Sequence, residues 1–130
     1  MGAHLAVAKM AAAMAFYRRV GLTVPVGAED QDHVELDVGG GVHLAFSTQT
    51  VIEMYDNGWR GLSPATATVL QFGVVSRAAV DEMYHSLTSA GYQGHLAPVD
   101  AFWGSRYCEV DDADGNAVGF HSPVDRPIRD

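Results

Sequence analysis

The chain has 130 residues, a formal net charge of −8 at pH 7 and a single cysteine, Cys108, which excludes an intramolecular disulfide. Its length suits one domain, which removes about two-thirds of the unfolded surface from water, and no apolar run reaches the ~18 residues of a membrane span. The basic residues are scattered rather than gathered into a phosphate-facing patch, so the sequence predicts neither a nucleic-acid partner nor a membrane partner.

The first half of the chain reads as a strand, a helix and three more strands. Met10, Met14 and Tyr17 recur at helical spacing and form one apolar stripe, and Gly21 is suited to end that helix. Residues 33–38 alternate polar and apolar side chains, as in a strand with one face in water. The expected elements are a strand at 4–8, a helix at 10–20, a strand at 22–26, a strand at 33–38, a glycine turn at 39–41 and a strand at 42–46.

The second half repeats this order after a connector. Val80, Met83 and Leu87 share one face of a predicted helix, and Gly91 is placed to cap it. A short strand is expected to end before Pro98, because proline cannot donate a hydrogen bond to a sheet. The expected elements are a connector at 49–66 with about one helical turn, a strand at 67–75, a helix at 78–90, strands at 93–97, 105–110 and 117–121, a loop at 99–104, a turn at 111–116 and a surface tail at 123–130.

The two halves also match residue by residue. Residues 5–20 can be laid without a gap on residues 72–87, at a constant spacing of 67 positions, and Tyr17 then matches Tyr84. A chain built of two similar halves usually buries something between them, and a cleft at the junction of the halves is the natural ligand site. The repeat therefore predicts two similar modules and a binding cavity.

Three stretches, in this order, carry a resemblance to a known family: residues 14–22 (MAFYRRVGL), residues 79–92 and residues 103–116. Together they resemble the vicinal-oxygen-chelate superfamily, which includes glyoxalases, bleomycin resistance proteins and extradiol dioxygenases. The resemblance implies an α+β fold of paired βαβββ modules whose curled mixed sheets surround a cavity, and a homodimer. It implies a single domain at 1–130, with one module at about 3–48, the connector at 49–66, the second module at about 67–122 and the tail at 123–130.

The same resemblance bears on whether a metal is bound. Metal-dependent members of the superfamily place His, Gln or Glu at matching positions on four strands, and a count along this chain finds these positions occupied by residues without donor side chains. A divalent ion needs imidazole or carboxylate donors. The sequence therefore predicts no metal cofactor and a place in the metal-free branch. The four positions are Gly2, Ala45, Val69 and Gly119.

Four polar residues near these positions leave an alternative open. His4, Gln71 and His121 each follow a ligand position by two residues, and His43 precedes one by two, so each keeps the same strand face. In the alternative, a divalent metal held by His4, His43 and His121 serves a lyase, isomerase or dioxygenase by polarising a substrate oxygen. Against it, the shift runs forward on three strands and backward on the fourth, which spreads the donors over two levels.

The candidate ligand-binding residues are mostly aromatic. Trp59 lies in the connector, and the loop at 99–104 with the strand after it supplies three more rings that can stack on a planar ligand. Arg106 is expected to meet a ligand carboxylate or to pair with Glu109. The expected ligand-binding residues are Trp59, Phe102, Trp103, Arg106, Tyr107, His43, Phe46 and His121.

The predicted function is metal-independent binding or sequestration of a small organic molecule, of the bleomycin-resistance or antibiotic-resistance type. The acidic charge favours a cationic ligand and the rings favour an aromatic one. Whether the chain also catalyses a reaction stays open, and a module that binds a protein partner is a third interpretation. Residues 1–4 lack a basic region followed by an apolar run, so no signal peptide is expected and the predicted location is the cytoplasm.

Overall fold

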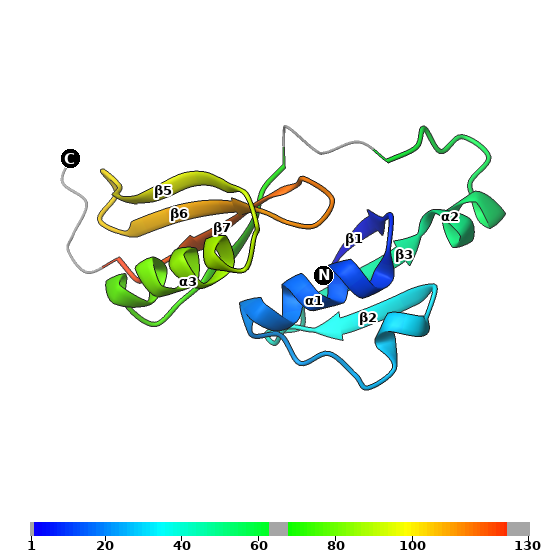
Figure 1. Ribbon diagram of the computed structural model, residues 1–130, viewed down its shortest axis with the longest axis horizontal. Coiled ribbons are helices and arrows are strands. Elements are labelled where there is room, and N and C mark those ends of the chain that lie inside the picture. Colours follow the sequence, from blue (N-terminus) through cyan, green and yellow to red (C-terminus); the bar gives the residue numbers. More distant parts are fainter. Residues whose placement is uncertain (1, 63–67, 125–130) are drawn as a thin grey trace. The chain divides into compact units, whose positions relative to one another are not determined.

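A computed structural model describes residues 2–62 and 68–124 and divides the chain into two compact units. Unit 1 is Met1–Ser63 and unit 2 is Pro64–Asp130. Each unit carries a mixed sheet with a helix against one face, which confirms the expected α+β class (Figure 1). The expected first residue of the strand at 67–75 and the end of the expected tail lie outside the described residues.

Unit 1 has a three-stranded sheet in the order β1-β3-β2. Strand β1 pairs with β3 in parallel, and β2 pairs with β3 in antiparallel fashion. The glycine turn between β2 and β3 forms as expected, with positive φ at three successive glycines. The elements of unit 1 are β1 (Gly2–Val7), α1 (Met10–Val20), the 3₁₀ turn η1 (Ala28–Asp30), β2 (His33–Asp37), β3 (His43–Thr48) and α2 (Gln49–Tyr55).

Helix α1 forms where the apolar stripe predicted it. The stripe buries Met14 and Tyr17 against the sheet, and the Tyr17 ring lies 5.0 Å from the Phe46 ring, measured between centroids. Gly21 ends the helix with φ +108°, and its N–H donates to the Arg18 carbonyl while the next N–H donates to the Tyr17 carbonyl. A glycine suits this position because the left-handed conformation strains other residues.

The expected strand at 22–26 does not form, although the structure describes these residues. Pro25 has no N–H to donate, and its carbonyl instead accepts from the Ala28 N–H in a turn that leads into η1. Val26 is fully exposed, and an ion pair between Arg18 and Glu29 ties η1 to α1. The apolar residues at 22–26 favour an extended backbone, but no neighbouring strand pairs with this segment among the described residues.

Unit 2 has a four-stranded sheet in the order β4-β7-β6-β5. Strand β4 pairs with β7 in parallel, and the other pairs are antiparallel. Strand β5 continues through Pro98 rather than ending before it, because β5 lies at the sheet edge and its pairing with β6 is interrupted by register shifts. The elements are β4 (Leu70–Gly73), α3 (Arg77–Ser89), β5 (Gly94–Asp100), β6 (Arg106–Asp111) and β7 (Ala117–His121).

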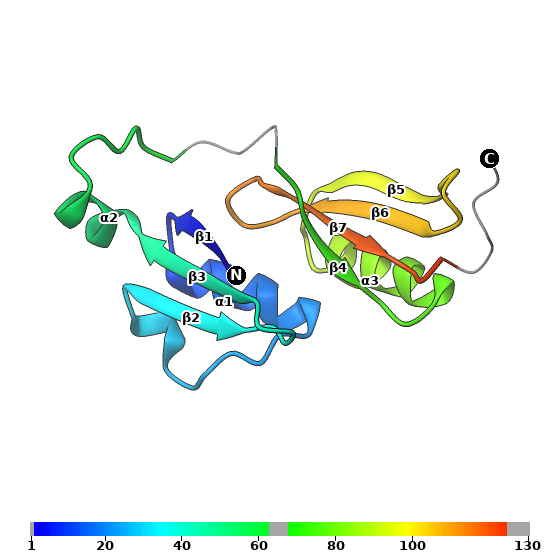
Figure 2. The same ribbon diagram turned by 180° about the vertical axis from the view of Figure 1, so that it is seen from behind.

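In both units the first strand pairs in parallel with the last, and the helix between them covers one face of the sheet (Figure 1). In unit 2 the Ser76 side chain caps α3 by accepting from the Ala79 N–H, and α3 buries Val80 and Leu87. The Cys108 sulfur lies 3.9 Å from the Val80 carbonyl oxygen, so every second residue of β6 from Arg106 on faces α3. The opposite face, which Figure 2 shows from the side away from α3, carries no helix among residues 68–124 of the unit and is called the open face of unit 2.

Candidate functional site

The open face of unit 2 is built by alternation along the strands. Tyr107 and Glu109 alternate with Cys108, so their side chains lie on the open face. Directly opposite residues share a face, and Val99 is the partner of Tyr107 while Leu96 is the partner of Glu109. The face therefore sets a phenol and a carboxylate beside two exposed aliphatic side chains.

Tyr107 is the centre of a short hydrogen-bond chain. Its hydroxyl donates to Glu109 Oε2 over 2.6 Å, and Gln71 Nε2 donates to the same hydroxyl over 3.4 Å. The residue is buried, with 6% of its surface exposed. Burial and then the hydrogen bond to Glu109 raise the pKa of Tyr107 well above its usual range. The phenol therefore stays protonated near neutral pH and acts as a donor.

The Tyr107 ring lies directly against Gly119 of β7. A Cβ at position 119 would overlap the phenol oxygen and ring carbons of Tyr107. Position 119 is also one of the four positions at which the family resemblance implies a metal ligand, so the space for that ligand holds the tyrosine ring. Within each unit, over residues 2–62 and 68–124, no three His, Cys, Asp or Glu side chains are placed to hold a metal ion.

His95 lies between two carboxylates at the edge of this face. Its Nε2 is 3.6 Å from Glu109 Oε1, and its Nδ1 is 3.5 Å from Asp111 Oδ1. Just over half of the His95 side chain is exposed, whereas the two carboxylates are largely covered. Sequence reasoning missed these three residues. The alternation of Tyr107, Glu109 and Asp111 along one strand was the available signal for the two acids.

The structure brings together three of the expected aromatic residues. The Trp103 ring is 6.1 Å from the Tyr107 ring and 5.1 Å from the Phe102 ring, measured between centroids. Phe102 is 92% exposed and Trp103 is 36% exposed, so this pair forms the accessible part of the group. His121 is the strand partner of Tyr107 and lies half-buried on the same face.

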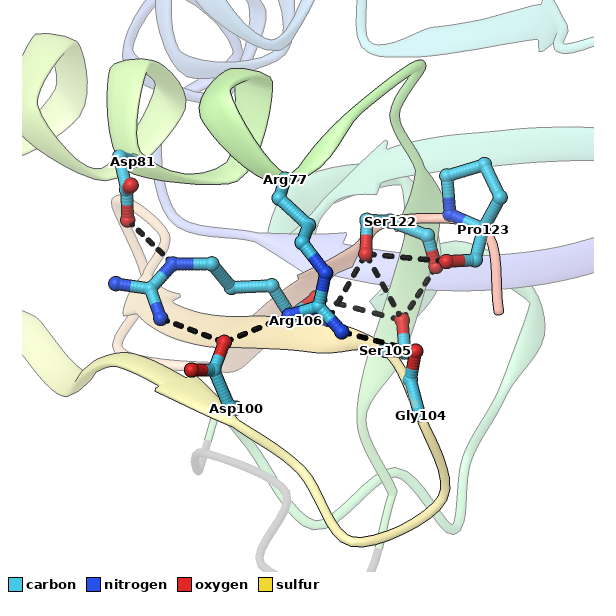
Figure 3. Close-up of polar contacts among 8 residues, drawn as sticks. All are labelled: Arg77, Asp81, Asp100, Gly104, Ser105, Arg106, Ser122 and Pro123. Carbon is cyan, nitrogen blue, oxygen red and sulfur yellow. Dashed lines mark hydrogen bonds and ion pairs between the residues drawn. The ribbon is translucent and has the colours of Figure 1, made fainter. Parts of the chain in front are cut away.

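Arg106 faces α3 rather than the open face, as Figure 3 shows. Its Nε donates to Asp81 Oδ1 and its Nη1 donates to Asp100 Oδ1, each over 2.9 Å. The expected pairing with Glu109 is wrong, because alternation along β6 puts Arg106 and Glu109 on opposite faces of the sheet. The hydrogen bonds to Asp81 and Asp100 raise the pKa of Arg106 above its usual value.

Cys108 also points toward α3 and is fully buried. Burial, followed by the nearby charge of Asp81, raises the pKa of its thiol to about 11. An uncharged, inaccessible thiol is a poor nucleophile, so Cys108 is a packing residue of the sheet.

Phe46 and His43 of unit 1 point to opposite faces of β3. Phe46 is fully buried against Tyr17 on the α1 side, so it belongs to the core of unit 1. His43 is exposed on the face away from α1, where Gly2 and Asp37 are its strand partners. His4 lies on this same face, whereas His121 belongs to unit 2, so the three histidines of the alternative metal site are not assembled within either unit.

A histidine pair that the sequence did not predict lies on the same face of unit 1. His4 Nε2 is 2.8 Å and His33 Nδ1 is 2.7 Å from the hydroxyl oxygen of Ser47, which is fully buried. The two rings stand edge to face with centroids 5.9 Å apart. The hydroxyl holds both imidazoles in place, and its own burial keeps it from reacting with a ligand.

Trp59 belongs to unit 1, whereas Phe102, Trp103 and Tyr107 belong to unit 2. It is half-buried in the wall of a surface hollow of about 480 Å³, formed by α2 and residues 56–61. Glu53 and Asp56 line the same hollow.

In the described part of the chain, no helix combines the length and the apolar character needed to cross a membrane.

Comparison with known proteins points to one superfamily. The family model of the Glyoxalase/Bleomycin resistance protein/Dioxygenase superfamily matches residues 3–120. A solved glyoxalase/bleomycin resistance protein/dioxygenase family enzyme from Burkholderia phytofirmans PsJN is 19% identical, with a TM-score of 0.79 over 93% of this chain and 95% of that chain. A glyoxalase-related enzyme from Fulvimarina pelagi is 22% identical, with a TM-score of 0.78 over 94% of this chain and 86% of that chain.

A lactoylglutathione lyase from Agrobacterium tumefaciens is 21% identical, with a TM-score of 0.66 over 95% of this chain and 92% of that chain. No curated protein matches the chain significantly. At these levels of identity the solved structures show a shared fold, and the activity has to be argued from the residues of the site.

Proposed function

Because the chain belongs to the Glyoxalase/Bleomycin resistance protein/Dioxygenase superfamily, we propose that it binds a small organic molecule without a metal, as a sequestering protein of the bleomycin-resistance type. The open face of unit 2 is the proposed binding surface. The observation that carries the proposal is the accessible ring of Trp103 beside the Tyr107–Glu109 pair. This arrangement offers a stacking surface and a fixed polar group within one sheet.

The proposal of metal-free binding rests on the chemistry of the donor positions. The residues at the four family positions have no side chain that can ligate a divalent ion, and the Tyr107 ring fills the space beside Gly119. The residues present do not fit the family's metal set. A ligand oxygen or nitrogen would instead meet the groups of the Tyr107 hydrogen-bond chain.

The chemistry of the open face favours a ligand that is both aromatic and positively charged. Glu109 supplies a carboxylate next to the exposed aliphatic side chains of Leu96 and Val99, and Trp103 supplies a ring face. A cation over an aromatic face gains about 0.5–2 kcal/mol, and more as water is excluded. The formal charge of −8 adds a long-range attraction for cations.

The test is a fluorescence titration with metal-free bleomycin and with ethidium, a planar aromatic cation whose charge does not change with pH. We expect saturable quenching of tryptophan emission at one ligand per chain, unchanged by EDTA. The quenching is expected to persist in Trp59→Phe and to disappear in Trp103→Phe, because the Trp103 ring adjoins Tyr107 of the proposed surface whereas Trp59 belongs to unit 1.

Two results would contradict this proposal. Binding that disappears with EDTA would make a metal part of the site. Quenching that is lost in Trp59→Phe and kept in Trp103→Phe would move the site to the hollow beside α2. Calorimetry of both variants provides a readout of binding that does not depend on either fluorophore.

A further inference from the structure

His95 occupies the side of Glu109 that Tyr107 leaves free. Glu109 Oε2 accepts the Tyr107 hydroxyl, while Oε1 faces His95 Nε2 at 3.6 Å. The other imidazole nitrogen faces Asp111 Oδ1 at 3.5 Å. These distances exceed those of a direct hydrogen bond, so the ring sits in the field of both carboxylates without being locked to either.

Strand β5, which carries His95, packs against β6 and α3. Among the described strands of unit 2, β5 is the edge of the sheet and pairs with β6, from which Glu109 and Asp111 face the ring. On the other side of the sheet, α3 places the Tyr84 hydroxyl against Gly94, the residue before His95. The two carboxylates are therefore the charged groups that the structure sets against this imidazole.

The charge state of the imidazole changes what the two carboxylates can bind. A protonated imidazole carries N–H groups on both nitrogens, so it can pair with both acids at once. A neutral imidazole has one N–H and turns a lone pair toward one of the acids. Because about half of its side chain is exposed, the neutral ring is free to swing outward and leave both carboxylates to another cation.

The neighbouring side chains determine the class of that cation. Leu96 and Val99 present exposed aliphatic surface beside Glu109 and Tyr107, and Trp103 adds a ring next to Tyr107. An ammonium, amidinium or guanidinium group attached to an apolar or aromatic body would pair with the acids while its body covers this surface.

We propose that His95 is a built-in competitor for the carboxylates of Glu109 and Asp111, so that the open face of unit 2 binds organic cations at neutral pH and releases them on acidification. This inference rests on the proposed function and adds both the ligand class and its control by protons. Among the side chains, histidine is the one that ordinarily changes charge between pH 5 and 8, so it is the group through which protons can control this face.

The experiment measures ethidium affinity by calorimetry at pH 8, 7, 6 and 5.5 for the wild type, His95→Gln and His85→Gln. In the wild type we expect the affinity to fall severalfold from pH 8 to 5.5, because only the chains whose acids are not occupied by the protonated imidazole can bind ethidium. His95→Gln is expected to keep its high-pH affinity across the range. His85→Gln, an exposed histidine on α3, is the matched control and is expected to follow the wild type.

Parallel pH profiles for the wild type and His95→Gln would overturn the inference while leaving the proposed function intact, because ethidium would still bind. Failure of ethidium and bleomycin to bind at any pH would overturn the proposed function and this inference with it. Asp111→Asn provides a second check, since removing one of the two acids should weaken ethidium binding at pH 8 and shrink the pH dependence.

Discussion

The fit between Gly119 and Tyr107 shows how single residues shape the open face. The phenol is held from two sides, by Glu109 as acceptor and by Gln71 as donor, so it cannot swing away without losing both bonds. Glycine at 119 leaves the room that the ring needs. The hydrogen-bonded position of Tyr107 therefore requires a glycine at position 119.

Gly119→Ala is expected to destabilise the protein by about 1–3 kcal/mol, the usual cost of forcing an extra carbon into a packed site. Replacing a glycine also lowers the conformational entropy of the unfolded chain, which stabilises the protein by about 0.4–1 kcal/mol. This gain is smaller than the cost of the contact between the new methyl group and Tyr107, so a net loss of stability is expected. Urea unfolding of the variant provides the free-energy difference.

A double-variant cycle with Tyr107→Ala isolates the contact. In the Tyr107→Ala background, Gly119→Ala should hardly change the free energy of unfolding, so the effects of the two single substitutions on stability should not add. Additive effects would show that the methyl group meets something other than Tyr107.

Two of the aromatic residues that the sequence offered for a ligand wall lie together. Trp103 and Tyr107 were candidates because they stand in and after one loop, and the structure places their rings 6.1 Å apart, while their contact with a ligand stays a prediction. His95 could not be predicted, because its position opposite Glu109 and Asp111 depends on the register shifts between β5 and β6. A sequence pattern carries no information on such pairings.

At the scale of elements, one ionic network joins α3 to β5 and β6 (Figure 3). Asp100 Oδ1 accepts from Arg77 Nη1 over 2.7 Å and from Arg106 Nη1 over 2.9 Å. Arg77 also donates to the Gly104 carbonyl, and Arg106 also donates to Asp81. The network fixes the first turns of α3 against the start of β6, on the face opposite the proposed ligand surface.

Asp100→Asn is expected to destabilise the protein more than Asp81→Asn, because Asp100 is shared by two arginines and Asp81 contacts one. Both acids are about half exposed, so each pair contributes only about 0.2–1 kcal/mol at low salt. Urea unfolding at low salt and in 1 M NaCl checks this, since salt should narrow the difference between the variants. A difference that is insensitive to salt would indicate a packing effect rather than an ionic one.

The elements were predicted best where local chemistry decides them. The helix expected at 10–20 is confirmed, and the helix expected at 78–90 lies one residue earlier, because an apolar stripe and a terminal glycine are local signals. The strand expected at 22–26 was wrong, since an extended segment becomes a strand only when a partner is available. The early end expected for β5 was wrong because proline is tolerated at a sheet edge.

For the whole molecule, the decisive prediction concerns metal. Protein purified without chelator or affinity metal is expected to hold no stoichiometric metal, and Ni, Zn, Mn or Fe(II) is expected to leave its melting temperature unchanged. The reason is that the family's ligand positions lack donors. Elemental analysis and thermal-shift titration are the measurements.

One bound metal ion per chain, or a melting temperature that rises to saturation with one of these ions, would contradict the prediction. It would favour the enzyme alternative built on His4, His43 and His121. Loss of that ion in His121→Ala would then identify the site, with His85→Ala as the matched control.

The parallel pairing of first and last strands also has a consequence for how the chain folds during synthesis. In unit 1, β1 finds its partner only when β3 has been made, and in unit 2, β4 must wait for β7. Each unit then closes within its own stretch of chain, so the first can be complete while the ribosome is still adding the second. Until each closing strand arrives, the waiting strand offers unpaired backbone groups, which is the interval in which a nascent chain is exposed to aggregation.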